Sequence, residues 1–379
     1  MTQPLGVYIH IPFCRSKCVY CDFCSVTGWD DKLLDRYCKA LETQMEEYFA
    51  LQHPVVDTVY FGGGTPSVLG GRRLARLLDS LRSKVRLLSG AEITVEVNPE
   101  SCDAALFKAL KRAGVNRISM GVQSADDGEL RRIGRIHTFA QAAQAVELCR
   151  QHCTDNISLD IIYALPGQTL EKYLDSLDKL ISLSPKHISA YALKVEEGTP
   201  LWRENPELPD EDTQADMYLE TVRRLEQAGW QQYEISNFAK PGFHSRHNSR
   251  YWDLSPYLGL GCAAHSWYGG QRFQFTASIP DYVEGVLGRR PILEEQDELA
   301  EGDRHGEYVM LRLRTCAGID PLEFRRRFNR DFAPYAARLE KYRAAGYTEC
   351  LPDGRWRLTP TGFLVSNPII ADVVWICRE

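Results

Sequence analysis

The stretch VYIHIPFCRSKCVYC, residues 7–21, decides the fold. Its first six residues are rich in β-branched and aromatic side chains, which is typical of a strand, and the run closes at Pro12. Cys14, Cys18 and Cys21 follow at once, separated by three and then by two residues. A strand that leads directly into a loop of closely spaced thiols predicts a site for a soft metal centre.

The three thiols favour an iron–sulfur cluster, because three thiolates on a four-iron cluster leave one iron open to a further ligand. Zinc and a disulfide are the alternatives. A structural zinc site usually takes four ligands from two separated pairs, and the sequence has no CxxC or HxxxH partner downstream. A tight disulfide is rare in the cytosol. Cys24 supplies a fourth nearby thiol, which either closes the cluster or stands beside it; we expect a bystander.

Strands and helices alternate downstream of this start. Apolar runs predict strands at residues 7–12, 58–61, 93–98, 117–122, 158–165 and 187–193. Helix-like spacing of apolar residues predicts helices at residues 32–49, 74–81, 104–113, 140–149 and 170–183. This order indicates an α/β fold in which outer helices cover a parallel sheet. Such sheets bind ligands at the carboxyl ends of their strands, where the glycines and polar residues of this chain gather.

The cysteine motif, taken with six βα units, resembles the radical S-adenosylmethionine (SAM) superfamily. The resemblance implies a partial (β/α)6 barrel, a [4Fe-4S] cluster on Cys14, Cys18 and Cys21, and SAM on the open iron. In such proteins the cofactor carries the radical chemistry and the protein positions it.

The resemblance also implies where SAM is bound. Gly63, Gly64 and Thr65 follow the second strand, and glycines allow backbone N–H groups to approach a ligand closely. A tight turn is the alternative. The side chains expected to contact SAM lie at or near the other strands: Tyr8, Glu96, Gln123, Arg135 and Asp160. Their alternative is an ordinary salt-bridge network, since buried charges are costly without partners.

Within the superfamily, the chain resembles the coproporphyrinogen III oxidases of the anaerobic haem pathway and their relatives, the HemW-type haem chaperones. The motifs span nearly the whole chain: YIHIPFC, FGGGTPS, EVNPE, GVQS, ALPGQT, HNSRYW, GCAAHS and GRWRLTPTGF. The oxidases have a cysteine two places beyond the third cluster ligand, where this chain has Phe23. This departure is more similar to the chaperones.

The motif HNSRYW, residues 247–252, is similar to a sequence associated with haem in the chaperone branch. Imidazole is a common axial ligand of haem iron, so His247 is the expected ligand. Tyr251 and Trp252 offer flat apolar faces to a porphyrin, and Arg246 or Arg250 is available to a propionate. The alternative is that these side chains pack against the edge of the sheet.

Three further histidines lie near the predicted sites. His265 and His244 offer a second axial donor to haem, although a histidine near glycines is more often part of a turn. His10 lies on the first strand, and we interpret it as a structural residue or as a partner that supports the cluster from outside.

The pattern changes in the last third of the chain. A helix at residues 213–228 and a strand at 233–238 follow the barrel, and the stretch 243–275 has no assignable regular structure. Helices at residues 306–314, 321–327 and 335–345 precede a hairpin of 347–351 and 355–358, which resembles a winged helix. We therefore expect three regions: the barrel with both cofactor sites at 1–240, a flanking haem-motif segment at 241–294, and a helical domain similar to that of the oxidases at 295–379.

Composition narrows the class of partner. The chain has 379 residues, of which 44% are hydrophobic, and its net charge of −6 gives no basic field for nucleic acid. Residues 300–379 are also balanced, with 13 Lys and Arg against 11 Asp and Glu. The first residues lack a secretory pattern and no apolar run is long enough to span a bilayer, so we expect a cytoplasmic location.

The resemblance favours a haem chaperone that binds haem, a [4Fe-4S] cluster and SAM, and delivers haem to respiratory haemoproteins at the membrane. Such a protein is a carrier without coproporphyrinogen oxidase activity, and a homodimer is a further expectation. The alternative is an oxygen-independent coproporphyrinogen III oxidase, which would decarboxylate two propionates. A radical enzyme that methylates or opens haem itself is a third hypothesis.

Overall fold

The computed structural model describes residues 3–297 and 304–375. Its main feature is a curved, 12-stranded sheet in the order β12-β11-β10-β9-β1-β2-β3-β4-β5-β6-β8-β7. The strands are β1 (Leu5–Ile11), β2 (Val55–Gly63), β3 (Arg86–Val97), β4 (Arg117–Gln123), β5 (Ile157–Tyr163), β6 (His187–Ala192), β7 (Gln231–Glu234), β8 (Asn237–Ala239), β9 (Tyr257–Leu260), β10 (His265–Tyr268), β11 (Gln271–Phe275) and β12 (Leu293–Asp297).

Strands β1 to β6 pair in parallel and in chain order, which confirms the partial (β/α)6 barrel. Their side chains are mostly buried, as expected for parallel strands that are covered on both faces. The register sets Ile11 against Gly63 and Val97 against Met120. The loops after successive strands therefore leave the sheet along one edge.

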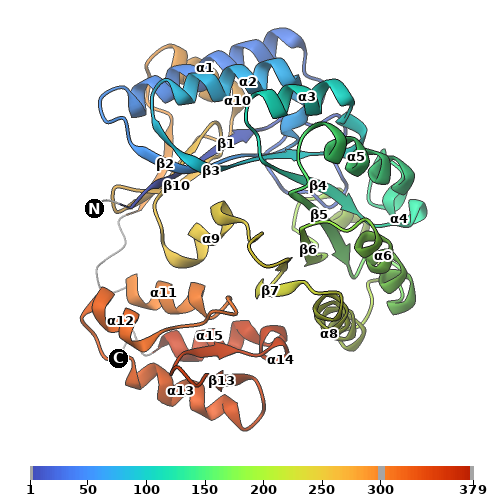
Figure 1. Ribbon diagram of the computed structural model, residues 1–379, viewed down its shortest axis with the longest axis vertical. Coiled ribbons are helices and arrows are strands. Elements are labelled where there is room, and N and C mark those ends of the chain that lie inside the picture. Colours follow the sequence, from blue (N-terminus) through green and yellow to red (C-terminus); the bar gives the residue numbers. More distant parts are fainter. Residues whose placement is uncertain (1–2, 298–303, 376–379) are drawn as a thin grey trace.

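The outer face of the barrel is covered by helices (Figure 1). These are α1 (Asp31–Phe49), α2 (Gly70–Arg82), α3 (Ala104–Arg112), α4 (Asp127–Arg132), α5 (Phe139–His152), α6 (Leu170–Ser182) and α8 (Glu211–Gln227). Most begin at a residue whose side chain accepts a hydrogen bond from a backbone N–H of the first turn; Thr138 and Gln141 form a full capping box. A shorter helix, α7 (Pro200–Glu204), follows β6.

The chain after α8 differs from the predicted strand at residues 233–238. Two short antiparallel strands, β7 and β8, stand there instead, because the chain turns at Ile235 and Ser236. β8 then pairs antiparallel with β6 and ends the parallel part of the sheet.

The unassigned stretch 243–275 proves to be regular. Helix α9 (Arg246–Asp253) lies on the concave side of the sheet, between the barrel and the C-terminal helices (Figure 1). β9 pairs in parallel with β1, and β10 to β12 continue the sheet in antiparallel order. Helix α10 (Ile279–Leu287) packs against α1.

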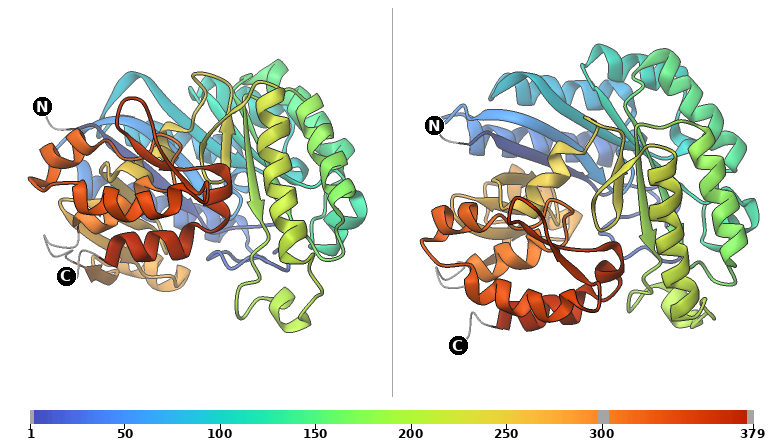
Figure 2. Two further views of the ribbon diagram at one scale, coloured as in Figure 1. Left: turned by 90° about the horizontal axis from the view of Figure 1, so that it is seen from below. Right: turned by 60° about the horizontal axis from the view of Figure 1, so that its bottom comes forward.

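The C-terminal segment forms one group of helices beside the barrel (Figure 2). It consists of α11 (Arg304–Arg312), α12 (Pro321–Phe328), α13 (Ala333–Arg343), the hairpin of β13 (Thr348–Cys350) and β14 (Trp356–Leu358), α14 (Pro360–Leu364) and α15 (Ser366–Val374). The three predicted helices and the hairpin are confirmed; α14 and α15 are additional. One hydrophobic core runs through both parts of the molecule. Within the described ranges, no helix is long and apolar enough to cross a membrane.

Candidate functional site

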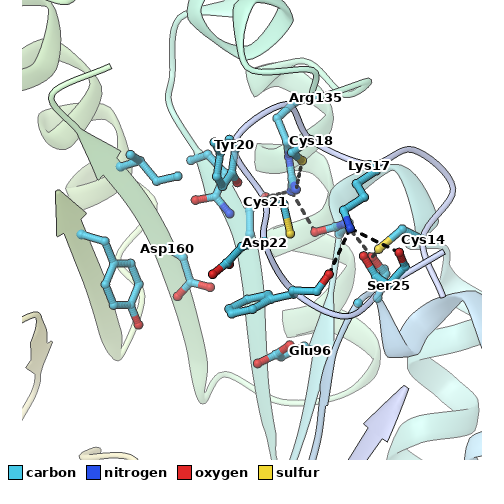
Figure 3. Close-up of a pocket in the computed structure, with 18 of the residues that line it drawn as sticks. Cys14, Lys17, Cys18, Tyr20, Cys21, Asp22, Ser25, Glu96, Arg135 and Asp160 are labelled. Atoms are coloured by element: carbon cyan, nitrogen blue, oxygen red, sulfur yellow. Dashed lines mark hydrogen bonds between the residues drawn. The ribbon is translucent and has the colours of Figure 1, made fainter. Parts of the chain in front are cut away.

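A cavity of about 380 Å³ lies at the carboxyl ends of the barrel strands (Figure 3). All three cysteines of the motif line it. Seven of the eight residues predicted to contact SAM line it as well: Gly63, Gly64, Thr65, Glu96, Gln123, Arg135 and Asp160. Tyr8 is the exception. The fold therefore brings the predicted residues together around one cavity, although they are spread over 146 positions, from Cys14 to Asp160.

The cysteine loop is held to the barrel by backbone hydrogen bonds. Cys14 N–H donates to Val26 O at 2.9 Å, and Val19 N–H donates to Ile133 O at 3.2 Å. Cys14 is nearly buried, whereas Cys18 and Cys21 are partly exposed, and all three are free thiols. Cys21 points toward the centre of the cavity (Figure 3).

The arrangement of the three thiols fits a cluster better than a single ion. Among residues 3–297 and 304–375, only one group of His, Cys, Asp and Glu side chains is close enough to hold a single metal ion, and it does not include these cysteines. Three thiols spaced around one cavity, with no fourth cysteine among its lining residues, are the donor set of a cluster with one open iron.

The glycine loop at the end of β2 forms part of the cavity wall next to Cys14. Gly63 has a φ of +108°, and a Cβ there would stand 2.5 Å from the His10 ring. A Cβ on Gly64 would stand 2.9 Å from the backbone of Phe13. Because side chains cannot be accommodated at either position, glycine is required for the close approach of β1 and this loop.

Two carboxylates face the cavity from β3 and β5. Glu96 accepts hydrogen bonds from the Tyr60 hydroxyl at 2.7 Å and from Gly63 N–H at 3.2 Å. Burial raises the pKa of Glu96 to about 7, and burial also raises the pKa of Asp160. A cationic ligand would stabilise the ionised form of both groups, since a nearby positive charge favours the ionised carboxylate.

Arg135 and Asn98 join the cysteine loop to the strand ends. The Arg135 guanidinium donates to Cys18 Sγ at 3.5 Å and to Asn98 Oδ1 at 2.8 Å. Asn98 in turn donates to Thr65 Oγ1 at 3.0 Å, and that hydroxyl donates to Cys14 Sγ at 3.5 Å. Sequence analysis did not single out Asn98; the EVNPE motif that contains it was the available signal.

Tyr8 has a different place from the one predicted. Its hydroxyl is 3.0 Å from His10 Nδ1, and Tyr8 does not line the cavity. The His10 ring lies behind the glycine loop, with Nε2 3.0 Å from the carbonyl oxygen of Cys24. Tyr8 and His10 therefore support the glycine loop from behind rather than facing into the cavity.

Helix α9 carries the HNSRYW motif into the concave side of the barrel. His247 is fully buried, with Nδ1 3.0 Å from Thr58 Oγ1 and Nε2 3.1 Å from the Tyr251 hydroxyl. Its ring stacks on Tyr60 at a centroid distance of 5.2 Å. Burial, with the nearby charges of Arg250 and Arg117, lowers the pKa of His247 to about 3. Both ring nitrogens are engaged, so His247 is not open to an incoming ligand in this conformation.

A second hollow, which we call the aromatic groove, adjoins α9. It measures about 290 Å³ and its walls come from α9, the β9 to β11 strands and α11. Its lining residues include Tyr251, Tyr257, Trp267, Phe273, His265 and Arg272. His265 is exposed there, whereas Trp252 does not line the groove and His244 stacks on Tyr233 outside it.

Comparison with known sequences agrees with this geometry. The sequence pattern of the radical SAM superfamily matches residues 8–180, and that of the HemN C-terminal domain matches residues 299–365. The heme chaperone HemW of Escherichia coli (strain K12) is 37% identical over 372 residues, which cover 97% of each chain. HemW of Bacillus subtilis (strain 168) is 36% identical, covering 86% of this chain and 87% of its own.

Among solved structures, the coproporphyrinogen III oxidase HemN of Escherichia coli, a radical SAM enzyme, superposes with a TM-score of 0.86. The match covers 99% of this chain and 90% of that chain, at 24% identity. At that identity the likeness establishes the fold.

Proposed function

We infer the function from the premise that this chain belongs to the HemW family of haem chaperones. It is a haem carrier built on a radical SAM barrel, with a [4Fe-4S] cluster and SAM in the cavity and haem at α9. Haem then passes to haemoproteins of the respiratory chain. The aromatic groove beside the HNSRYW motif is the observation that supports this proposal most strongly.

The cavity residues fit the cluster and SAM. Cys14, Cys18 and Cys21 would hold the cluster, which supplies an open iron position and an electron when bound. The Arg135 guanidinium donates a hydrogen bond to Cys18 Sγ at 3.5 Å and so helps to hold the cysteine loop in place. Glu96 is placed to accept a hydrogen bond from an ammonium group, and Asp160 to bind a further polar part of the nucleoside.

The proposed haem site is the aromatic groove. Tyr251, Tyr257 and Trp267 supply apolar faces for a porphyrin, and Arg272 is available to a propionate. His265 is the accessible imidazole and hence the axial donor we favour. His247 acts from behind by holding the Tyr251 hydroxyl, 3.1 Å from its Nε2. A direct contact of His247 or Trp252 with haem stays a prediction, because neither residue lines the aromatic groove.

Further parts of the proposal concern where the carrier acts. We place it in the cytoplasm, with acceptor haemoproteins at the membrane, and a homodimer is compatible with this role.

A haem-transfer assay tests the function. Protein with a reconstituted cluster is loaded with haem, freed of excess haem, and mixed anaerobically with membranes that contain haem-depleted respiratory haemoproteins. We expect the Soret absorbance to move from the carrier to the membranes, with haem conserved. Conversion of coproporphyrinogen III by the cluster-loaded protein, without haem transfer, would instead support the oxidase. Loss of haem absorbance together with release of deoxyadenosine would indicate an enzyme acting on haem.

A further inference from the structure

A second group of soft ligands lies behind the glycine loop, outside the cavity. His10 on β1, Cys24 at the end of the cysteine loop and Cys262 in the turn after β9 bring their ligand atoms within 4.8 Å of one another. It is the one tight group of potential metal ligands that the described ranges contain. Cys262 lies far from His10 and Cys24 in sequence, so the fold itself creates the group.

The group is separate from the proposed cluster site. Neither Cys24 nor Cys262 lines the cavity. The Cys24 thiol donates to the carbonyl oxygen of Ala277 at 3.2 Å, and Ala277 does not line the cavity either. Cys262 is fully buried. Cys24 is therefore placed to serve another ligand than the cluster.

The surroundings hold the backbone of His10 and Cys262 in position. The Tyr37 hydroxyl donates to the carbonyl oxygen of His10 at 2.9 Å and accepts from Cys262 N–H at 3.1 Å. Gly261, with a φ of +105°, has no room for a side chain, since a Cβ would stand 2.6 Å from the Tyr37 hydroxyl. A ligand set on such a packed frame needs little reorganisation to bind an ion.

The His10 ring is oriented as a metal-binding imidazole is oriented. Its Nδ1 lies 3.0 Å from the Tyr8 hydroxyl, and its Nε2 lies 3.0 Å from the backbone carbonyl oxygen of Cys24, a hydrogen bond that the ion would replace. A histidine that binds a metal usually donates the N–H of its other nitrogen to a nearby oxygen, which fixes the tautomer. Tyr8 supplies that oxygen, and this accounts for a buried tyrosine that the cavity does not use.

We propose that His10, Cys24 and Cys262 form a binding site for one thiophilic d10 cation, Zn²⁺ or Cu⁺. Two thiolates and one imidazole suit these ions, whereas Mg²⁺ and Ca²⁺ require oxygen ligands. Binding releases the two thiol protons to solvent, and the ring proton of His10 moves from Nε2 to Nδ1. The ion ties β1, the cysteine loop and the turn after β9 together.

The first test is a zinc titration of the full-length chain carrying Cys14→Ser, Cys18→Ser and Cys21→Ser, which removes the competing cluster thiols. Zn²⁺ is titrated anaerobically against a chromophoric chelator. We expect one equivalent to bind, and further Cys24→Ser substitution to weaken binding by more than about 100-fold, beyond the effect typical of outer-shell residues. Cys350→Ser, which changes a partly buried cysteine in the C-terminal segment, is the matched control and leaves the affinity unchanged.

Spectroscopy and ion identity provide the second test. Co²⁺ in the same background gives thiolate-to-cobalt charge transfer and tetrahedral d–d bands, which Cys24→Ser weakens and His10→Gln shifts. Competition between Zn²⁺ and Cu⁺ decides which ion is preferred. Any of three results overturns the proposal. Neither ion binds, the Cys24→Ser chain binds with equal affinity, or Cys24 and Cys262 form a disulfide that persists in the presence of a reductant. None of these outcomes depends on the haem function.

Discussion

Glu96 is the cavity residue whose ionisation state is expected to control ligand binding. Its carboxylate is buried and has two hydrogen-bond donors, Tyr60 and Gly63, and no guanidinium or ammonium group bonds to it in the described structure. Its pKa of about 7 places the change of charge within the physiological range.

The pH dependence of SAM binding follows from this pKa. An ammonium group needs an ionised Glu96, so the affinity for SAM rises as pH increases from 6 to 8. Glu96→Gln weakens binding at pH 8 and removes the rise. Isothermal titration calorimetry of cluster-loaded protein between pH 6 and 8 measures the SAM affinity of the wild type and of Glu96→Gln. If the affinity of Glu96→Gln still rises with pH, another group is responsible for the ionisation.

The same shift affects stability in the opposite sense. Because folding raises the pKa of Glu96, its contribution to stability is full below about pH 4.5 and is lost as pH rises through about 7. Glu96→Gln therefore stabilises the ligand-free protein at pH 8, by at most about 3 kcal/mol. At pH 5 the gain nearly disappears. Urea unfolding at the two pH values tests this, and an equal gain at both contradicts it.

Gly63 gives a further residue-scale prediction. In Gly63→Ala the new Cβ meets the His10 ring at a φ of +108°, so both strain and overlap oppose it. Gly167→Ala is the control, because Gly167 has a φ of +70° and open space around it. We expect the control to lose about 1–2 kcal/mol from backbone strain alone. We expect Gly63→Ala to lose more stability than the control and also to bind SAM less well. Equal losses of stability in the two variants would contradict the close contact between position 63 and the His10 ring.

At the scale of elements, α9 depends on Arg250 for its position. The buried guanidinium pairs with Asp57 on β2 and donates to Thr58 Oγ1 at 3.1 Å and to Pro4 O at 3.0 Å. Arg246, on the same helix, also reaches Asp57, at 3.4 Å, but is half-exposed.

The two arginines therefore predict different costs of substitution. Arg250→Lys leaves buried acceptors without donors and lowers the free energy of unfolding by about 3–5 kcal/mol. Arg246→Lys costs about 1 kcal/mol or less, as is usual for an exposed pair. Denaturant unfolding measures both values, and hydrogen exchange in α9 shows where Arg250→Lys acts. Similar costs would mean that Arg250 does not anchor the helix.

The predictable elements are those with a strong local pattern. β1 and β5 are apolar runs because parallel strands are buried on both faces, and their bounds are close to the predicted ones. β12 has the sequence LEEQD and is exposed throughout, so nothing in its pattern marks a strand; pairing with β11 creates it. α9 is rich in polar and charged residues, of which His247 and Arg250 are buried, so no apolar pattern marks it in the sequence.

The candidate site was predictable for a similar reason and within similar limits. The cluster cysteines are close together in sequence, so their spacing is visible. Cys24 and Cys262 meet across the fold, and the contact of Cys24 with Ala277 spans 253 positions. No local pattern reveals such a group, and the sequence therefore favoured a bystander role for Cys24.

At the scale of the whole molecule, the SAM cavity and the aromatic groove are separate. The described residues that line one do not line the other. We therefore predict that SAM and haem bind at the same time, and that saturating SAM changes the affinity for haem by less than about 10-fold, or 1.4 kcal/mol. Haem titration with and without SAM measures this coupling. Mutual displacement of the two ligands would mean that they share one site.

The central claim is that haem binds in the aromatic groove beside α9. The most direct measurement is an anaerobic haem titration, followed at the Soret band, of cluster-loaded protein and three variants: His265→Ala, His247→Ala and His152→Ala. We predict saturable binding that His265→Ala weakens by at least about 10-fold, that His247→Ala weakens less, and that His152→Ala, on the remote helix α5, leaves unchanged. Absence of saturable binding, or equal affinity in all four proteins, would contradict the claim.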